Sequence, residues 1–123
     1  MPPLASLPVP TCPCGAASYD ACCGRLHRGE AQATTPEELM RSRYAAYALG
    51  ETEHVWRTWH PRTRPAEVTH DPSTRWTGLE VLAAQGDEVE FRARFEGPEG
   101  PGTLHERSLF ARRAGRWFYL EAR

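Results

Sequence analysis

Four cysteines near the N-terminus are the residues best suited to carry chemistry. Cys12, Cys14, Cys22 and Cys23 fall within a dozen positions of the chain. Zinc prefers four tetrahedral ligands, and thiolates at about 2.3 Å satisfy it without an open coordination position. Gly15 lets the backbone turn toward the ion after the first pair of ligands. The pattern predicts a structural zinc site, and a metal with four protein ligands is not expected to be catalytic.

Other fates of these thiols remain open. Adjacent Cys22 and Cys23 cannot easily bridge each other, and a disulfide across the loop would close only a very short ring. A redox role is a further alternative, although the C-x-x-C spacing is absent. The thiols could also be unliganded. His27, four residues after Cys23, could replace a cysteine in the metal shell.

Length and composition predict one soluble domain with a small appendage. The 123 residues are 40% hydrophobic and 25% charged, with a net charge of −1. Near neutrality argues against a protein that binds nucleic acid by bulk electrostatics. One weak functional hypothesis is that an arginine-rich C-terminal hairpin binds nucleic acid. Its arginines are Arg107, Arg112, Arg113 and Arg116.

The first ten residues lack the features of a targeting segment. MPPLASLPVP has no basic region and four prolines in place of an apolar run, so it predicts a disordered leader. No membrane span is expected, and the cytoplasm is the expected location. A reducing compartment favours metal binding over disulfides for clustered thiols.

Two helices are expected after a connector over residues 25–34. Thr35 as N-cap, Pro36 and Glu38 as part of a capping box predict a helix that stops at Gly50. A second helix is expected from Thr52 to about Trp59. Residues expected on the buried sides are Leu39, Met40, Ala46, Tyr47, Leu49, Val55, Trp56 and Trp59. Residues expected to be more exposed are Glu38, Arg41 and Ser42, and also His27, His54, His70 and His105.

The second half predicts an antiparallel meander after an extended loop over residues 62–73. Alternation of apolar and charged residues indicates a half-buried strand over 89–95. Further strands are expected over 75–83, 104–112 and 116–122, with turns at 85–87, 97–102 and 114–115. Helices followed by a meander indicate an α+β fold, with the helices on one face of the sheet.

The cysteine segment resembles a known zinc module. CPCG followed by an aromatic residue and then CCG is similar to the SEC-C motif, found at the C-terminal tail of the SecA translocation ATPase and in other bacterial proteins. The gap between Cys14 and Cys22 is one residue shorter than usual. Some SEC-C modules present a metal knuckle to protein or ribosomal partners, and the resemblance implies the same for this chain.

Strings along the rest of the chain resemble the bacterial YchJ family. They are LMRSRYAAY, TWHP, TRWTGLEVL, ARF, ERSLF and RWFYLE, in this order. The resemblance implies an N-terminal SEC-C motif followed by an NTF2-like domain, a curved sheet wrapped by helices into a cone. It departs in a proline-rich stretch and in the lack of a second SEC-C motif. The implied division is a leader over 1–10, a SEC-C motif and connector over 11–33, and the NTF2-like domain over 34–123.

An NTF2-like cone often holds a pocket between its helices and the concave sheet face. We expect Arg43, His60 and Glu106 to meet there, with His60 as an acid or base and an arginine holding an anion. The candidate residues are Arg41, Arg43, Tyr44, Tyr47, Trp59, His60, Glu106 and Arg107. Each of them could equally be a satisfied packing residue.

Two functional hypotheses therefore compete with the nucleic-acid hypothesis given above. The leading hypothesis is a zinc-stabilised binding or adaptor protein, which the resemblance to SEC-C modules implies. The sequence contains no nucleophile motif and no phosphate-binding glycine loop that would support an enzyme. The alternative is a small-molecule binder or enzyme that uses the cone. A homodimer through the sheet is expected by analogy only. The larger domain is expected to survive loss of the metal, because its core should be separate from the cysteines.

Overall fold

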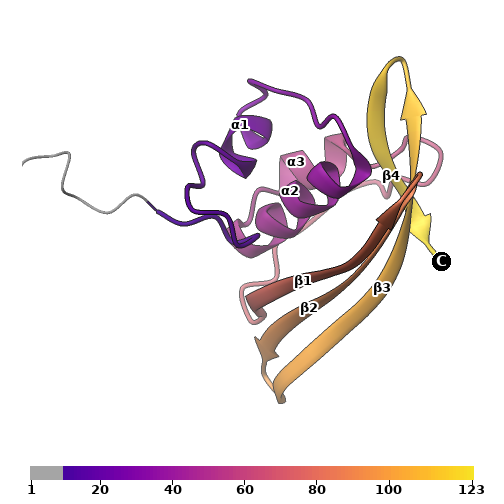
Figure 1. Ribbon diagram of the computed structural model, residues 1–123. Coiled ribbons are helices and arrows are strands. Elements are labelled where there is room, and N and C mark those ends of the chain that lie inside the picture. Colours follow the sequence, from indigo (N-terminus) through magenta and orange to yellow (C-terminus); the bar gives the residue numbers. More distant parts are fainter. Residues whose placement is uncertain (1–9) are drawn as a thin grey trace, which may run out of the picture.

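The computed structural model describes residues 10–123, so the expected leader lies almost wholly outside the described residues. Three helices precede a four-stranded sheet (Figure 1). The helices are α1 (Cys23–His27), α2 (Pro36–Leu49) and α3 (Thr52–Arg57), and the strands are β1 (Arg75–Gln85), β2 (Glu88–Gly97), β3 (Gly100–Arg113) and β4 (Arg116–Ala122). In the part of the chain from 10 to 123, no helix combines the length and apolarity needed to span a membrane.

The sheet is an antiparallel meander in the order β1-β2-β3-β4, which confirms the predicted α+β class. It curves, and all three helices lie on one side of it (Figure 1). Register shifts in β1 and between β3 and β4 mark bulges, which bend a strand and increase its twist. The strands are longer than expected, since β2 and β3 pair as far as Gly97 and Gly100.

Helix α2 has the bounds that its sequence predicts. The Thr35 hydroxyl accepts a hydrogen bond from the Glu38 amide at 3.1 Å. The Glu38 carboxylate reaches back to the Thr34 amide at 2.8 Å, one residue earlier than in a standard capping box. Gly50 ends the helix in the left-handed region with φ of 77°. Local side chain to backbone bonds therefore set both ends of α2.

Helix α3 ends earlier than the predicted Trp59. The Thr58 hydroxyl bonds back to the His54 carbonyl at 2.6 Å, and the chain then leaves the helix. Trp59 instead forms a parallel bridge with Tyr119 of β4, and the His60 amide donates to the Tyr119 carbonyl at 2.7 Å. Backbone groups of Thr58 and His60 thus form hydrogen bonds with Tyr119 at the edge of β4 instead of continuing the helix. The expected connector over 25–34 likewise contains part of α1.

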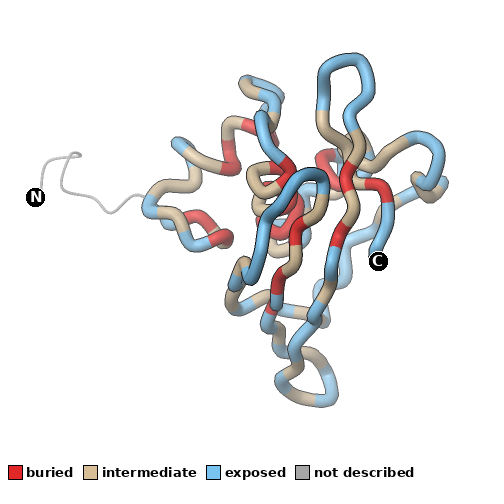
Figure 2. The backbone as a smooth tube through the Cα atoms, turned by 45° about the vertical axis from the view of Figure 1, so that its right-hand side comes forward, coloured by how far each residue is buried: buried red, intermediate tan, exposed pale blue. Residues whose placement is uncertain are grey.

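Helix α2 is buried on nearly all sides over its middle section, instead of along one face only. Residues 39–46 are buried with the one exception of Arg41, because α1, α3 and the sheet all contact the helix. Buried segments gather where the helices face the sheet (Figure 2). Ser42, expected to be exposed, is 0% exposed. Leu49, expected to be buried, is 50% exposed because it lies at the end of the helix beyond these contacts.

Trp56 was also expected in the core, and that prediction is wrong. Its indole lies at the surface against the proline-rich segment 62–73. The Trp56 Nε1 donates to the Pro65 carbonyl at 3.1 Å, and the Arg64 guanidinium stacks 3.7 Å from the ring centroid. Trp56 therefore packs against the irregular segment 62–73 and fixes its position, instead of packing in the core.

His27 and His54 form a buried polar chain between the cysteine segment and the two longer helices, although both were expected at the surface. The Tyr19 hydroxyl lies 2.6 Å from His27 Nδ1, and His27 Nε2 lies 2.8 Å from the Ser42 carbonyl. The Ser42 hydroxyl lies 2.9 Å from His54 Nε2. The two imidazole rings contact each other at a tilt of 56°, with centroids 4.6 Å apart.

The partners of each ring fix its tautomer. A carbonyl can only accept, so His27 carries its proton on Nε2 and accepts from Tyr19 at Nδ1. An Arg57 guanidinium nitrogen lies 3.3 Å from His54 Nδ1, so that nitrogen accepts and Nε2 donates to Ser42. Burial lowers the pKa of His54 to about 3, and burial also lowers the pKa of His27. Both rings are therefore neutral at physiological pH.

This network predicts a loss of stability on acidification. The folded pKa of His54 lies below its ordinary value of 6.5, so the unfolded chain binds the extra proton first as the pH falls below 6.5. Lowering the pH from about 7.5 to about 5.5 should cost the wild type about 1.4 kcal/mol more than His54→Gln. Urea unfolding at the two pH values measures the difference.

His70→Gln is the matched control, because His70 lies at the surface. It should keep the pH dependence of the wild type. Equal pH dependence in His54→Gln and the wild type would show that the His54 ring takes up a proton in the folded state.

Candidate functional site

The cysteine segment folds into a knuckle, defined here as residues 10–24. The Gly15 amide donates to the Cys12 carbonyl at 2.9 Å, and the Cys12 amide donates to the Ala16 carbonyl at 3.0 Å. Gly15 takes φ of 107°, a conformation that side chains disfavour. The Cys22 amide bonds to the Tyr19 carbonyl, and α1 starts at the next residue. Two tight turns thus bring the two cysteine pairs together.

The four sulfur atoms lie close enough together to bind one metal ion. All four lie within 4.8 Å of one another. The Cys14 and Cys22 sulfurs are 3.7 Å apart, and those of Cys22 and Cys23 are 3.8 Å apart. Four ligands about 2.3 Å from one zinc ion would be separated by about 3.8 Å. A disulfide requires about 2.05 Å, and all four cysteines are free. The donor set and its spacing therefore fit a zinc-type thiolate centre.

The electrostatics of the cluster also call for a cation. Hydrogen bonding from the Cys23 thiol lowers the pKa of Cys14 to about 4. Burial raises the pKa of Cys22 to about 11, and donation of a hydrogen bond to Cys14 raises the pKa of Cys23. One sulfur can thus ionise at the expense of its neighbours, since clustered thiolates repel. Cys22 and Cys23 therefore remain neutral thiols, and a bound cation would favour their thiolate forms.

His27 is not a member of this cluster. Its two ring nitrogens are both engaged, one by Tyr19 and one by the Ser42 carbonyl. The alternative in which it replaces a cysteine is therefore wrong. The imidazole instead ties α1 to α2.

The cysteines belong to the core of the whole chain. Cys12, Cys14 and Cys23 are at most 3% exposed and form one apolar cluster with α2 and the sheet. The Arg41 guanidinium also donates to the Cys14 carbonyl at 3.1 Å. The expectation of a separate core for the larger domain is therefore wrong, because the knuckle packs directly on α2.

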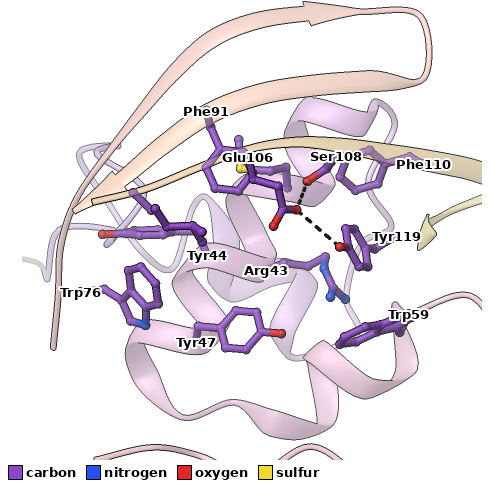
Figure 3. A pocket seen from close by; sticks show the side chains of 13 residues that line it. Arg43, Tyr44, Tyr47, Trp59, Trp76, Phe91, Glu106, Ser108, Phe110 and Tyr119 are labelled. Atoms are coloured by element: carbon purple, nitrogen blue, oxygen red, sulfur yellow. Dashed lines mark hydrogen bonds between the residues drawn. The ribbon is translucent and has the colours of Figure 1, made fainter. Parts of the chain in front are cut away.

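A second candidate site is a cavity of about 350 Å³ between the helices and the concave face of the sheet (Figure 3). Most of its wall is apolar and aromatic. The lining residues are Met40, Arg43, Tyr44, Tyr47, Trp59, Trp76, Phe91, Ala93, Leu104, Glu106, Ser108, Phe110 and Tyr119. Helix α2 supplies one wall, and inward-facing residues of β1, β2, β3 and β4 supply another. The cone is thus hollow between these two walls.

Arg43 is the charged group deepest in this cavity, at 6% exposed. Its Nη1 donates to the Val55 carbonyl at 2.8 Å and to the Thr58 hydroxyl at 2.7 Å. The guanidinium carbon lies 5.1 Å from the Trp59 ring centroid and 4.6 Å from that of Tyr119. Burial lowers the pKa of Arg43 to about 10, which leaves it protonated at neutral pH.

Glu106 faces the same cavity from β3. Its Oε2 accepts hydrogen bonds from the Ser108 hydroxyl and, at 3.4 Å, from the Tyr119 hydroxyl (Figure 3). Burial raises the pKa of Tyr119 to about 12, and the nearby Glu106 charge adds to this shift. The phenol therefore stays protonated and remains a donor to the carboxylate.

His60 and Arg107 do not line the cavity, contrary to expectation. His60 lies outside it, where its Nδ1 accepts from the Arg62 amide at 3.0 Å and its ring packs on Phe118. Arg107 points to the opposite face of the sheet, because side chains alternate along β3, and it approaches Glu90 at 3.8 Å. Tyr47, 39% exposed, lies at the cavity and not in the packed core.

Sequence reasoning did not place Trp76, Phe91 and Tyr119 in a site. All three are cavity residues on strands. The period-two alternation in the strands was the available signal, since it places Phe91 and Glu106 on the same face once the register of β2 and β3 is known.

The outer face of the sheet carries paired charges. Glu80 contacts Arg92, and Glu90 contacts both His105 and Arg107. Such cross-strand pairs of opposite charge stabilise neighbouring strands. Arg107, one of the four arginines that motivated the nucleic-acid hypothesis, therefore already faces a carboxylate.

Comparison with known proteins supports one family for both parts of the chain. Residues 35–122 match the family described as "YchJ, middle NTF2-like domain". A UPF0225 protein of Deinococcus radiodurans is 54% identical over 94% of this chain and 90% of its own. A UPF0225 protein of Streptomyces coelicolor is 51% identical over 94% of this chain and 96% of its own.

Two solved structures are similar as well. The solution structure of a SEC-C motif containing protein from Rhodopseudomonas palustris has a TM-score of 0.80 at 37% identity, and it covers 93% of this chain and 98% of that one. The crystal structure of a SEC-C motif containing protein from Psychrobacter arcticus has a TM-score of 0.74 at 27% identity, covering 93% and 82%.

The backbone of the knuckle makes a prediction about Gly15. With φ of 107° and open space around it, this position is limited by backbone conformation alone. Gly15→Ala should lower the free energy of unfolding by about 1–3 kcal/mol, the usual cost of such strain. Gly78→Ala is the control, because Gly78 also faces open space but has no positive φ. Urea unfolding of both variants checks this, and equal stability of the two would contradict it.

Proposed function

Because the chain belongs to the YchJ-like UPF0225 family of SEC-C motif proteins, we propose that it is a zinc-stabilised, non-catalytic binding protein. The observation that carries this proposal is the set of four sulfurs within 4.8 Å of one another. Cys12, Cys14, Cys22 and Cys23 would each supply one thiolate to the ion. Four such ligands leave no position for substrate or water, so the zinc would serve the fold.

Zinc would act on more than the knuckle. The ion would neutralise thiolates that otherwise repel, and it would fix three buried core residues against α2. Through α2 the effect would extend to the cone, since that helix contacts β1, β2 and β4.

The metal proposal is tested by zinc content and stability together. Protein purified under reducing conditions should contain about one zinc ion per chain by elemental mass spectrometry. The double variant Cys22→Ser/Cys23→Ser should lose the ion. Its unfolding free energy should fall by about 4 kcal/mol or more, the stabilisation given by a ligand at a thousand times its dissociation constant.

The whole chain should respond, because the cysteines share its core. Tryptophan fluorescence reports on the cone, where Trp59 and Trp76 lie, and circular dichroism reports on the helices. Ala17→Ser, an exposed change in the same loop, is the control and should behave as wild type. Wild-type protein without stoichiometric metal, or with cone stability indifferent to a strong chelator, would refute the proposal.

The knuckle surface is the proposed docking site for a protein or ribosomal partner. SEC-C motif neighbours motivate this assignment, and the knuckle lies at the edge of the fold, on the helical side of the sheet (Figure 1). Its exposed residues include Ala17, Asp20 and Ala21. The family resemblance supports the assignment, and a homodimer through the sheet stays a prediction.

A pull-down with surface variants tests this docking site. Ala17→Arg/Ala21→Arg changes the knuckle surface without touching a cysteine and should abolish capture of the partner. Glu99→Arg, an equally exposed change at the distant β2–β3 hairpin, should not. Recovery of the same proteins by all baits would exclude the knuckle as the docking site.

The second candidate function is small-molecule binding in the cone. The cavity of about 350 Å³ favours it, because ligand pockets start at roughly 300 Å³ and are mostly apolar with a few polar groups. Arg43 and Glu106 supply such groups here. Since His60 lies outside, the cavity lacks the acid–base residue that the enzyme hypothesis had required.

A further inference from the structure

We infer that the cone cavity is selective for a small, flat, apolar carboxylate, with its acid group at Arg43 and its rings against the aromatic wall. This inference rests on the small-molecule function proposed above and names the class of ligand. It depends on three features of the cavity: a deeply buried cation without a charged partner, a less buried carboxylate held by two hydroxyls, and an aromatic wall beside them.

Within residues 10–123, no carboxylate forms an ion pair with the Arg43 guanidinium. The partners of its guanidinium are a backbone carbonyl, a hydroxyl and two aromatic rings, none of which carries a formal charge. Both of these hydrogen bonds run from Nη1. A buried guanidinium is normally paired, because desolvation of an isolated charge is costly. A carboxylate is the natural complement, since its two oxygens match the geometry of the guanidinium.

Glu106 is the less deeply buried of the two charges. Its Oε2 receives two neutral hydroxyl donors, from Ser108 and from Tyr119. Glu106 acts on Arg43 only through the longer-range field, which raises the Arg43 pKa against the effect of burial. Because Arg43 is 6% exposed whereas Glu106 is only partly buried, the stronger demand for a counter-charge lies at Arg43, and an incoming anion is favoured there.

The wall of the cavity selects a flat body for that anion. Trp76 packs edge-on to Tyr44, with ring centroids 6.0 Å apart, and Phe91 lines the same wall. Flat rings gain most from such surfaces, because offset or edge-to-face stacking adds to the burial of apolar area. Ala93 leaves room beside these rings.

Besides Arg43, the Trp59 indole also has a polar group whose bonding capacity is unused. Among the buried side-chain nitrogen and oxygen atoms of residues 10–123, Trp59 Nε1 is the one without a hydrogen-bond partner. Trp59 stacks on the Arg43 guanidinium and lines the cavity. Its spectrum therefore provides a local probe of occupancy at the Arg43 end.

The test uses three probes with one ring system and different head groups. They are 2-naphthoate, 2-naphthalenemethanol and 2-naphthylmethylammonium, titrated into the zinc-loaded full chain. Indole and backbone amide resonances of Trp59 and Trp76 report binding by NMR. The acid should bind at least about tenfold more tightly than the alcohol, which corresponds to about 1.4 kcal/mol, and the ammonium should bind weakest.

Two variants assign the effect to its charges. Arg43→Met should lower the affinity for 2-naphthoate to that for 2-naphthalenemethanol, while the affinity for the alcohol stays unchanged. Glu106→Gln retains an acceptor for Ser108 and Tyr119. It should raise the affinity for 2-naphthoate several-fold and lower the affinity for 2-naphthylmethylammonium. If Arg43→Met does not fold, Glu106→Gln alone decides the sign of the electrostatic preference.

The outcomes separate this inference from the function on which it rests. Equal binding of acid and alcohol, or tightest binding of the ammonium, overturns the carboxylate class but leaves small-molecule binding in place. No shift of cavity resonances with any probe overturns both. Unchanged acid affinity in Glu106→Gln and Arg43→Met would move the site away from these charges and also overturn the inference.

Discussion

The packing of α2 on three sides at once is the constraint on which the rest of the structure depends. The knuckle and α1 cover one side of the helix, α3 covers another, and the curved sheet covers a third. A helix enclosed in this way must hold small or well-satisfied residues where neighbours approach. Ala45, Ala46 and Ser42 are all at most 1% exposed and meet that demand. Both candidate sites are built against this helix.

Polar groups inside the structure follow two different rules. Around His27 and His54 each buried donor meets an acceptor, so the chain from Tyr19 to Arg57 is a satisfied network. Such a network specifies one arrangement of helices, because any shift would leave a buried polar group without a partner. The cavity is different, since Arg43 keeps a charge that only neutral groups contact. The first pattern stabilises the fold, and the second is the feature on which the proposed ligand site depends.

The cysteine cluster couples local chemistry to global stability. Its sulfurs are close enough to repel as thiolates, yet three of the four cysteines lie within the common apolar core. A cation at this point would turn a destabilising cluster into a cross-link between two turns of the chain. In a protein of 123 residues such a link matters, because a core of this size leaves a small margin of stability.

Local sequence signals determined the elements and predicted the cysteine cluster. Thr35, Pro36 and Gly50 act through bonds within a few residues, and so the bounds of α2 could be predicted. Alternation of apolar and polar residues predicted the strands, and the spacing of the cysteines predicted that their sulfurs lie together. Tertiary structure alone decided which residues share a wall. The enclosure of α2 buried Ser42, His27 and His54 and exposed Leu49, and strand pairing brought Glu106 to the cavity of Arg43 while excluding His60. These outcomes depend on contacts between segments far apart in the chain, and spacing along a sequence carries no information about such distances.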